Sequence, residues 1–183
     1  MEILMNTNTI IELLKQVSWT GRFAYALMCG EKYLTSKYPH KEWGKLFSLL
    51  WKATSLETLD EWSEKVVDIL PECFFEFDSF EKSDFNHLTK ADYEKFQVLY
   101  QGLGSDFTQL IEYIYKIFED CAYASIEGSG QKSLSTIACI LKMLEDESIP
   151  APDPQLVAFS KFSEKNGWGD PFNGTKLSMV LKG

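Results

Sequence analysis

The chain has 183 residues, of which 45% are hydrophobic and 14% aromatic, so it can build the core of a single domain and is too apolar to be disordered. Its formal net charge of -9, from 27 acidic and 18 basic residues, argues against a nucleic-acid-binding protein and against binding to anionic membranes, which both call for a basic surface. The same charge suits a protein whose partner is basic.

Apolar residues recur at steps of three and four through most of the chain, which is the period of α-helices that bury one face. No stretch alternates with period two, so we expect little or no sheet. The pattern predicts an all-α single domain, residues 1–183, with an irregular tail from about residue 166 and with neighbouring helices packed as antiparallel pairs. About eight helices are expected, at residues 9–17, 20–36, 41–53, 56–70, 89–103, 105–125, 132–147 and 154–165.

Capping residues mark the starts of two of these helices. Thr54-Ser-Leu-Glu57 has the form of a capping box, in which the first and last side chains bond reciprocally to the helix start, and it predicts the beginning of helix 56–70. Asp153 is a capping residue followed by Pro154, which favours the first position of a helix. This pair predicts the helix 154–165.

Acidic residues are concentrated in one segment. Residues 57–84 hold ten acids and two lysines, a net charge of -8, whereas residues 1–56 have a net charge of +3 and residues 85–183 a net charge of -4. Like charges stacked on a helix cost stability, a few tenths of a kcal/mol per pair, which suggests that such a face has a use. Five acids follow steps of three and four and are expected to line one face of helix 56–70: Glu57, Asp60, Glu61, Glu64 and Asp68.

Residues 71–85, PECFFEFDSFEKSDF, contain five phenylalanines and five acids, a mixture that suits neither a solvated loop nor a core. In one interpretation the phenylalanines pack beneath the loop and the acids stay in water. In the other, one or two phenylalanines and the carboxylates face a basic partner, where acids speed the encounter and aromatic rings supply affinity. The spacing allows Phe74, Phe77 and Phe80 to share a helical turn that Phe75 cannot join.

Catalytic residues are scarce, because the chain has only two histidines, His40 and His87. His40 follows a proline and suits a solvated helix start. His87 lies in the acidic loop, where a neighbouring carboxylate would raise its pKa and make it a usable base. A nucleophile pair of Cys73 with His87 is the enzymatic alternative, although no spacing supports it. We expect no catalytic residues.

Metal and cofactor sites are not indicated by the spacing of potential ligands. Asp78, Glu81 and Asp84 offer the oxygen atoms that calcium takes, but their loop lacks the glycine of an EF-hand. The stretch Gly128–Ser133 lacks the Gly-Lys pair of a phosphate-binding loop, so we expect a flexible connection between helices there. No metal and no cofactor are expected.

The expected location is the cytoplasm. The N-terminus lacks the basic region and long apolar run of a secretory signal, and no stretch reaches the roughly 18 apolar residues of a membrane span. The four cysteines contain no CxxC pair and suit buried, reduced thiols.

Several segments spread over nearly the whole chain carry a family resemblance: RFAYALMCGEKYL from Arg22, LLWKAT from Leu49, LDEW from Leu59, LP from Leu70, CAYAS from Cys121 and GWGD from Gly167. They are similar to all-helical immunity proteins of bacterial polymorphic-toxin systems. The resemblance implies a non-catalytic protein that binds its cognate toxin in the producing cell and blocks it stoichiometrically. Many such toxins are basic nucleases, which agrees with the acidic segment.

We therefore expect a protein-binding domain, most specifically an immunity protein whose partner is a basic toxin domain. A helical adaptor or scaffold is the first alternative, and a hydrolase built around His87 is the second. Trp168 lies between two glycines and is not easily assigned to the core. In one interpretation a turn places its indole over a helix end; in the other it contacts the partner, and we include it among the contact residues. The predicted partner-binding residues are Glu57, Asp60, Glu61, Glu64, Asp68, Glu72, Glu76, Asp78, Glu81, Asp84 and Trp168.

Overall fold

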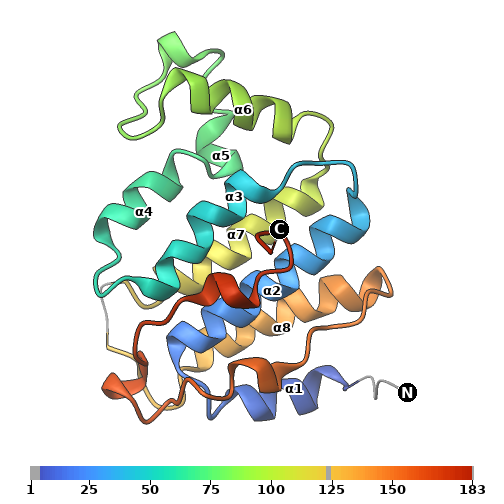
Figure 1. Cartoon of the computed structure of the whole chain (residues 1–183), viewed down its shortest axis with the longest axis vertical. Helices are drawn as coiled ribbons and strands as arrows, with labels where there is room; N and C mark the ends of the chain where they lie inside the picture. Colours follow the sequence, from blue (N-terminus) through green and yellow to red (C-terminus); the bar gives the residue numbers. More distant parts are fainter. Residues whose placement is uncertain (1–4, 123–124, 183) are drawn as a thin grey trace.

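The structure, a computed structural model, describes residues 5–122 and 125–182 and is all-α over these ranges, as predicted. Figure 1 shows one domain in which helices consecutive in the chain, such as α1–α2 and α7–α8, run in opposite directions. Within the described ranges there is no β-strand, and one isolated antiparallel bridge joins Val17 to Lys161. The α-helices are Thr7–Leu14 (α1), Trp19–Lys37 (α2), Gly44–Leu50 (α3), Asp60–Val67 (α4), Pro71–Phe74 (α5), Lys90–Tyr100 (α6), Ser105–Glu119 (α7) and Gln131–Asp146 (α8).

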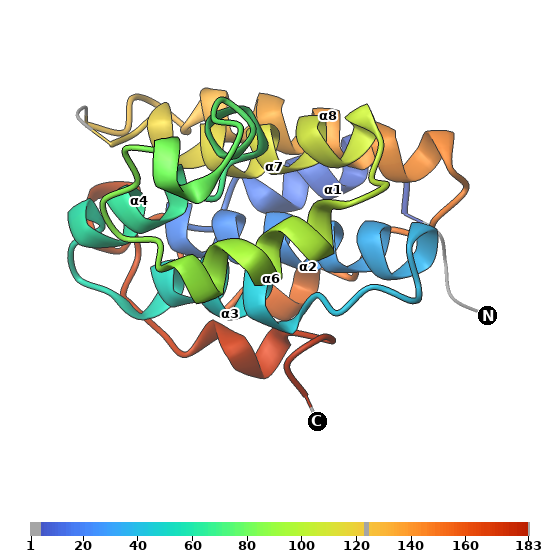
Figure 2. The ribbon, with the colours of Figure 1, turned by 90° about the horizontal axis from the view of Figure 1, so that it is seen from above.

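The helix α2 is the centre of the domain. Figure 2 shows it between a layer formed by α7 and α8 and, on its other side, α3 with the C-terminal segment. Every residue from Trp19 to Glu31 is therefore buried. Gly30 permits the close approach of α7, because a Cβ atom at this position would lie 2.8 Å from Cδ1 of Ile114.

The one-sided apolar patterns that predicted the two long helices after residue 104 are confirmed. The buried face of α7 includes Phe107, Leu110, Ile111, Ile114 and Phe118, and that of α8 includes Leu134, Ile137, Leu141 and Leu144. The predicted end of the first of these helices at residue 125 is wrong, because α7 ends at Glu119. Residues 123–124 of that prediction lie outside the described residues.

The predicted start of helix 56–70 is also wrong, since α4 begins at Asp60. Thr54 does not cap this helix. It is buried in a 3-10 turn, Trp51–Ser55, that continues α3, and its hydroxyl donates to the Trp51 carbonyl (2.8 Å) and accepts from the Gly174 N–H (3.1 Å). The capping side chain is thus used to hold the C-terminal segment.

The last predicted helix is wrong beyond its first turn. The aspartate cap forms, but only a 3-10 turn follows, at Pro154–Val157. The backbone beyond it pairs with the connection between α1 and α2: the Ser18 N–H donates to the Ser160 carbonyl (2.9 Å), and the Phe162 N–H donates to the Gln16 carbonyl (2.9 Å). These tertiary hydrogen bonds replace those that a helix would make within itself. The described ranges still contain eight α-helices, because the short helix α5 forms within residues 71–85, which were predicted to be a loop.

Residues 71–102, which comprise α5, the loop after it and α6, form what we call the end lobe, at one end of the long axis of the molecule (Figure 1). Tyr100 connects the end lobe to the main body: its ring lies 4.9 Å from that of Phe107, between centroids, and its hydroxyl donates to the Ile69 carbonyl (2.7 Å). Lys41 adds a hydrogen bond from its Nζ to the Gln101 carbonyl (2.6 Å).

Two charged side chains of α2, Arg22 and Glu31, lie in the core, and neither has an oppositely charged partner in the described part of the chain. Glu31 accepts hydrogen bonds from the indole N–H of Trp51 (2.7 Å), the backbone N–H of Met179 (2.6 Å) and the hydroxyl of Ser178. It thereby fastens the C-terminal segment to α2. The tail that the sequence predicted to be irregular has no α-helix but is anchored to the core.

Asp106, in the first turn of α7, shows a depressed pKa with a clear structural cause. Its carboxylate accepts hydrogen bonds from the hydroxyls of Tyr33 (3.1 Å) and Tyr38 (2.9 Å) and lies 3.2 Å from Nζ of Lys37. Burial raises the pKa of this carboxyl, but the bonds from Tyr38 and Lys37 outweigh burial and lower it below its usual value. Because the pKa is lower in the folded state, Asp106 stabilises the fold above the unfolded-state pKa of about 4, and this stabilisation is lost as the pH falls through the folded-state pKa.

We expect Asp106→Asn to lower the free energy of unfolding at neutral pH by up to about 1 kcal/mol, with solvent screening of the half-buried group taken into account. The difference from the unmodified chain should shrink as the pH falls through the lowered folded-state pKa of Asp106, because the native carboxyl then becomes protonated. Urea unfolding at a series of pH values measures this difference. A constant difference over the whole range would contradict the assignment.

Candidate functional site

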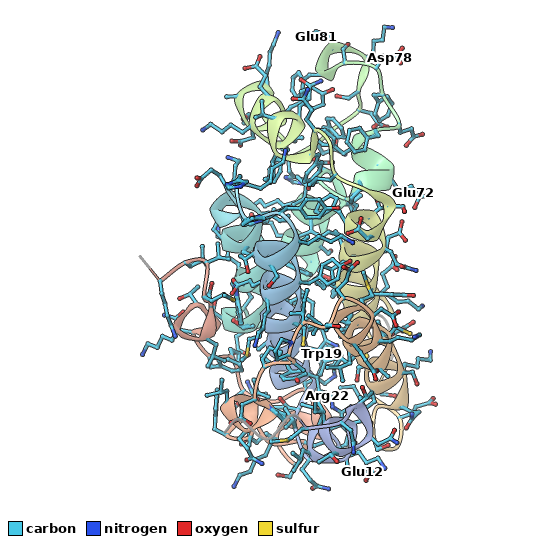
Figure 3. All side chains as sticks on the ribbon, turned by 90° about the vertical axis from the view of Figure 1, so that its right-hand side faces the viewer. Glu12, Trp19, Arg22, Glu72, Asp78 and Glu81 are labelled. Carbon is cyan, nitrogen blue, oxygen red and sulfur yellow. The ribbon has the colours of Figure 1, made fainter. Side chains whose placement is uncertain are left out.

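The residues predicted to contact a partner do not form one surface. They lie in three exposed regions, and one of them is buried. Three of them, Glu57, Asp60 and Trp168, border a cleft beside the start of α2. Glu61 and Glu64 lie on the exposed face of α4. Figure 3 shows Asp78 and Glu81 at the tip of the end lobe and Glu72 on its flank, with Glu12 at the opposite end of the molecule. The predicted contact acids on the end lobe, all exposed, are Glu72, Glu76, Asp78, Glu81 and Asp84.

Asp68 is not part of the exposed acidic surface. It is buried at the end of α4, and its Oδ2 accepts hydrogen bonds from the backbone N–H groups of His87 (2.7 Å) and Leu88 (3.0 Å). This carboxylate closes the loop of the end lobe onto α4, so its role is structural. The sequence gives no sign of this role, because the two donors lie about twenty residues further along the chain.

The acidic face expected on α4 is shorter than the three-four spacing predicts. Glu57 precedes the helix, and its carboxylate lies 3.1 Å from Nζ of Lys165. Asp60 and Glu61 occupy the first turn of α4, where carboxylates are stabilised by the positive end of the helix dipole. These acids therefore do not all destabilise the helix, and the acids of the end lobe carry more of the functional argument.

Five of the nine exposed acids of residues 57–84 are paired within the chain, and these pairs are weak. Glu61 lies 2.6 Å from Lys65, which lowers its pKa, and Glu64 lies 3.0 Å from Nε2 of His87. Exposed pairs of this kind contribute roughly 0 to 1 kcal/mol, so a partner can replace them at little cost. The other pairs are Glu57–Lys165, Asp78–Lys82 and Glu81–Lys90.

The remaining exposed acids of residues 57–84 have no cation within ion-pair distance among the residues that the structure describes. They are Asp60, Glu72, Glu76 and Asp84. Three of these four acids lie on the end lobe.

Four of the five phenylalanines of residues 71–85 form an aromatic cluster inside the end lobe. Phe74 is buried; its ring stacks on that of Tyr93, with centroids 4.8 Å apart, and meets Tyr100 edge-on at 5.2 Å. The phenylalanines do not share a helical turn as the spacing allowed, because α5 ends at Phe74. Three half-buried rings join the cluster from the loop: Phe77, Phe80 and Phe85.

Phe75 is the exception, because 59% of it is exposed. It lines a cleft of about 520 Å³ between α5 and the C-terminal end of α6, together with Val98, which is 68% exposed. We call this the α5–α6 cleft; its other lining residues are Gln97, Tyr100, Gln101 and Gly102. The first interpretation of the phenylalanines thus holds for four of them, and Phe75 alone fits the second. Val98 was not among the predicted contact residues; its signal in the sequence is an aliphatic residue that lies off the apolar stripe of its helix.

Trp168 lies between the core and a cleft of about 400 Å³ that Glu57, Asp60 and Leu56 also line. Its ring centroid lies 5.1 Å from that of Trp19, and its carbonyl accepts hydrogen bonds from the N–H (3.0 Å) and hydroxyl (2.7 Å) of Thr20. Trp168 therefore covers the start of α2 and leaves part of its side chain at the cleft.

No hydrogen bond joins Cys73 to His87, the residues proposed for a hydrolase, in the described part of the chain. Burial raises the pKa of the Cys73 thiol, and the surrounding carboxylates, Glu72 and Glu76 among them, raise it further, which opposes formation of the reactive thiolate. The His87 ring is held by Glu64, and neither Cys73 nor His87 lines the two clefts above.

No group of three or more His, Cys, Asp or Glu side chains in residues 5–122 and 125–182 is arranged to hold a metal ion. None of the helices in the same ranges has the length and apolar character needed to cross a membrane.

The chain was also compared with protein-family models, with curated proteins and with solved structures, and none of them matches it. The resemblance to helical immunity proteins therefore rests on the sequence segments that carry it, such as those beginning at Arg22 and Leu49.

Proposed function

We propose that the chain is a non-catalytic protein-binding domain, and most specifically an immunity protein that neutralises a basic toxin by stoichiometric binding in the cytoplasm. The observation that carries the proposal is the placement of exposed acids without internal cations on the end lobe, beside the exposed ring of Phe75. The sequence resemblance adds the toxin as the class of partner.

The arrangement suits a protein interface for two physical reasons. Exposed carboxylates attract a basic partner over roughly a Debye length, about 8 Å at physiological salt, and raise the rate of encounter. An aromatic anchor such as Phe75 then supplies affinity when it is desolvated at the centre of a contact. An adaptor or scaffold would use the same surface, and differs only in that its partner is not toxic.

The decisive experiment is to express the protein encoded by each neighbouring reading frame, first alone and then together with this chain, and to compare cell growth. We expect one of them to carry a basic domain that stops growth, to be rendered harmless by this chain, and to form a 1:1 complex by native mass spectrometry. Binding to a harmless neighbour would favour the scaffold, and the absence of both toxicity and binding would overturn the proposal.

Reversal of the uncompensated charges on the end lobe is expected to slow formation of that complex. We predict that the triple variant Glu72→Lys, Glu76→Lys, Asp84→Lys lowers the association rate constant at low salt by about 10-fold or more and removes most of its salt dependence. Stopped-flow association at two salt concentrations measures both effects.

A matched variant controls for the change in net charge. Glu12→Lys, Glu127→Lys, Glu145→Lys changes the charge by the same amount at exposed positions outside the 57–84 segment. Its association rate should stay within about 3-fold of the unmodified chain. Equal rates for the two triple variants would remove the end lobe from the contact surface.

A further inference from the structure

The α5–α6 cleft brings together the two most exposed large hydrophobic side chains in the described part of the chain, Val98 at 68% and Phe75 at 59%. Single exposed apolar residues are ordinary on a protein surface, whereas a pair that shares a cleft marks an interaction site more often. The Phe75 ring is also held in place, because it meets Phe74 edge-on at 5.3 Å and lies 6.0 Å from Tyr100. An anchor that is already ordered loses little conformational entropy on binding.

Two carboxylates lie close to Phe75 in the chain. Glu76 follows it directly and Glu72 lies three residues before it; both are exposed, and neither has a cation within ion-pair distance among the residues described. The residues that line the cleft, which include Gln97 and Gln101, carry no formal charge. A side chain that contacts Phe75 from the cleft is therefore near Glu76, a carboxylate that lacks a counter-charge.

The second border of the cleft is the C-terminal end of α6, which carries the negative end of the helix dipole and has no basic residue in its last turn. A lysine already binds there from the side: Nζ of Lys41 donates hydrogen bonds to the carbonyls of Val98 (3.3 Å) and Gln101 (2.6 Å). Lys41 thus already compensates this end of α6, and the uncompensated negative charge near the cleft comes from the side of α5.

These charges select among the possible occupants. A second copy of the chain would place acidic border against acidic border, which costs energy, and a nucleic acid or an anionic membrane would be repelled for the same reason. A basic protein satisfies both the apolar and the acidic parts of the site.

We infer that the α5–α6 cleft is the anchor point of the partner interface, and that it receives an apolar side chain of a basic protein, with Lys or Arg residues beside it facing Glu72 and Glu76. This assignment rests on the proposed protein-binding function, and it adds the site and the chemistry of the contacting segment. Whether the partner is a toxin does not affect it.

Photo-cross-linking in the cells that encode the chain tests the assignment. A benzoylphenylalanine is placed at position 75, at position 98, or at position 159 as a control; Phe159 is 55% exposed and lies outside the end lobe. We expect positions 75 and 98, but not 159, to yield the same cross-linked protein, one of positive net charge whose linked peptide holds an apolar residue next to Lys or Arg. Products that are absent, acidic, a second copy of the chain, or equally abundant from position 159 would overturn the assignment.

A second test measures the affinity of the chain for the protein identified by cross-linking. Phe75→Ser and Val98→Ser should each weaken binding by about 10-fold or more, while Phe159→Ser should change it less than about 3-fold. All three positions are exposed, so matching thermal melts will verify that folding is retained. A complex that forms but is indifferent to Phe75 and Val98 refutes the anchor point alone, whereas a harmless partner that binds at the cleft refutes only the immunity function.

Discussion

Arg22→Met is expected to lower the free energy of unfolding by about 3 to 5 kcal/mol. Arg22 is the only arginine of the sequence and is 1% exposed. Its guanidinium donates four hydrogen bonds and lies 4.8 Å from the ring centroid of Phe162. The acceptors are the carbonyls of Leu14 (3.0 Å), Lys15 (3.1 Å) and Gly130 (3.0 Å) and the hydroxyl of Ser133 (3.0 Å).

The size of the effect follows from what those acceptors lose. The acceptors come from the end of α1 and from the start of α8, so one side chain joins these two segments to α2. A hydrogen bond from a charged donor contributes about 1.5 to 3 kcal/mol, and removing the desolvated charge offsets part of the total. The Leu14 and Gly130 carbonyls still accept bonds from the Val17 N–H (3.1 Å) and the Ser133 hydroxyl (2.9 Å). Burial lowers the pKa of Arg22 to about 10, so the group is still cationic at neutral pH.

Urea unfolding of Arg22→Met and Arg22→Lys measures the contribution. Lysine keeps the charge but cannot reproduce the planar fork of donors, so we expect Arg22→Lys to lose nearly as much stability. Lys132→Met, at an exposed position in the first turn of α8, should change the stability by less than about 0.5 kcal/mol. A loss below about 1 kcal/mol for Arg22→Met would contradict a stabilising role for the hydrogen bonds of Arg22.

The sequence predicted those helices whose stability comes from their own buried face. The stripes of α7 and α8 are regular, and the helices form where the stripes lie. It failed where tertiary hydrogen bonds compete with helical ones. The backbone at Ser160 and Phe162 pairs with the connection between α1 and α2, and Thr54 turns to Gly174, and no local pattern encodes either choice.

The exposed acids were predictable from charge counting, because charge is a property of the sequence. Whether an acid faces water or a backbone N–H depends on contacts distant in the chain, which is why Asp68 was misassigned. The apolar anchor was only partly visible: Phe75 could be set apart from its neighbours by spacing, but its proximity to Val98 depends on how α5 and α6 meet. Arg22 and Glu31 could not be recognised as core residues, because polar residues on a helix are ordinarily exposed.

The other large effect is expected at Phe74, the centre of the aromatic cluster in the end lobe. Phe74→Ala should lower the free energy of unfolding by about 3 to 5 kcal/mol, through lost burial and the cavity that remains. The Phe74 ring contacts those of Phe75, Phe85, Tyr93 and Tyr100, so these rings lose a shared partner. Urea unfolding measures this loss of stability, and Phe75→Ala, at the neighbouring position, is the control variant.

Hydrogen exchange of the Phe74→Ala variant should place the loss in the end lobe. Amides of α6 are expected to exchange faster, because the end lobe is joined to the body through few side chains such as Tyr100. Amides of α2 and α8 should keep most of their protection, since α2 is enclosed by other helices. Phe75→Ala should cost less than about 1 kcal/mol, since its ring is already largely in water. Similar losses for the two variants would mean that Phe75 is held in the fold as firmly as Phe74, and a ring committed to the fold in that way would not be free to anchor a partner.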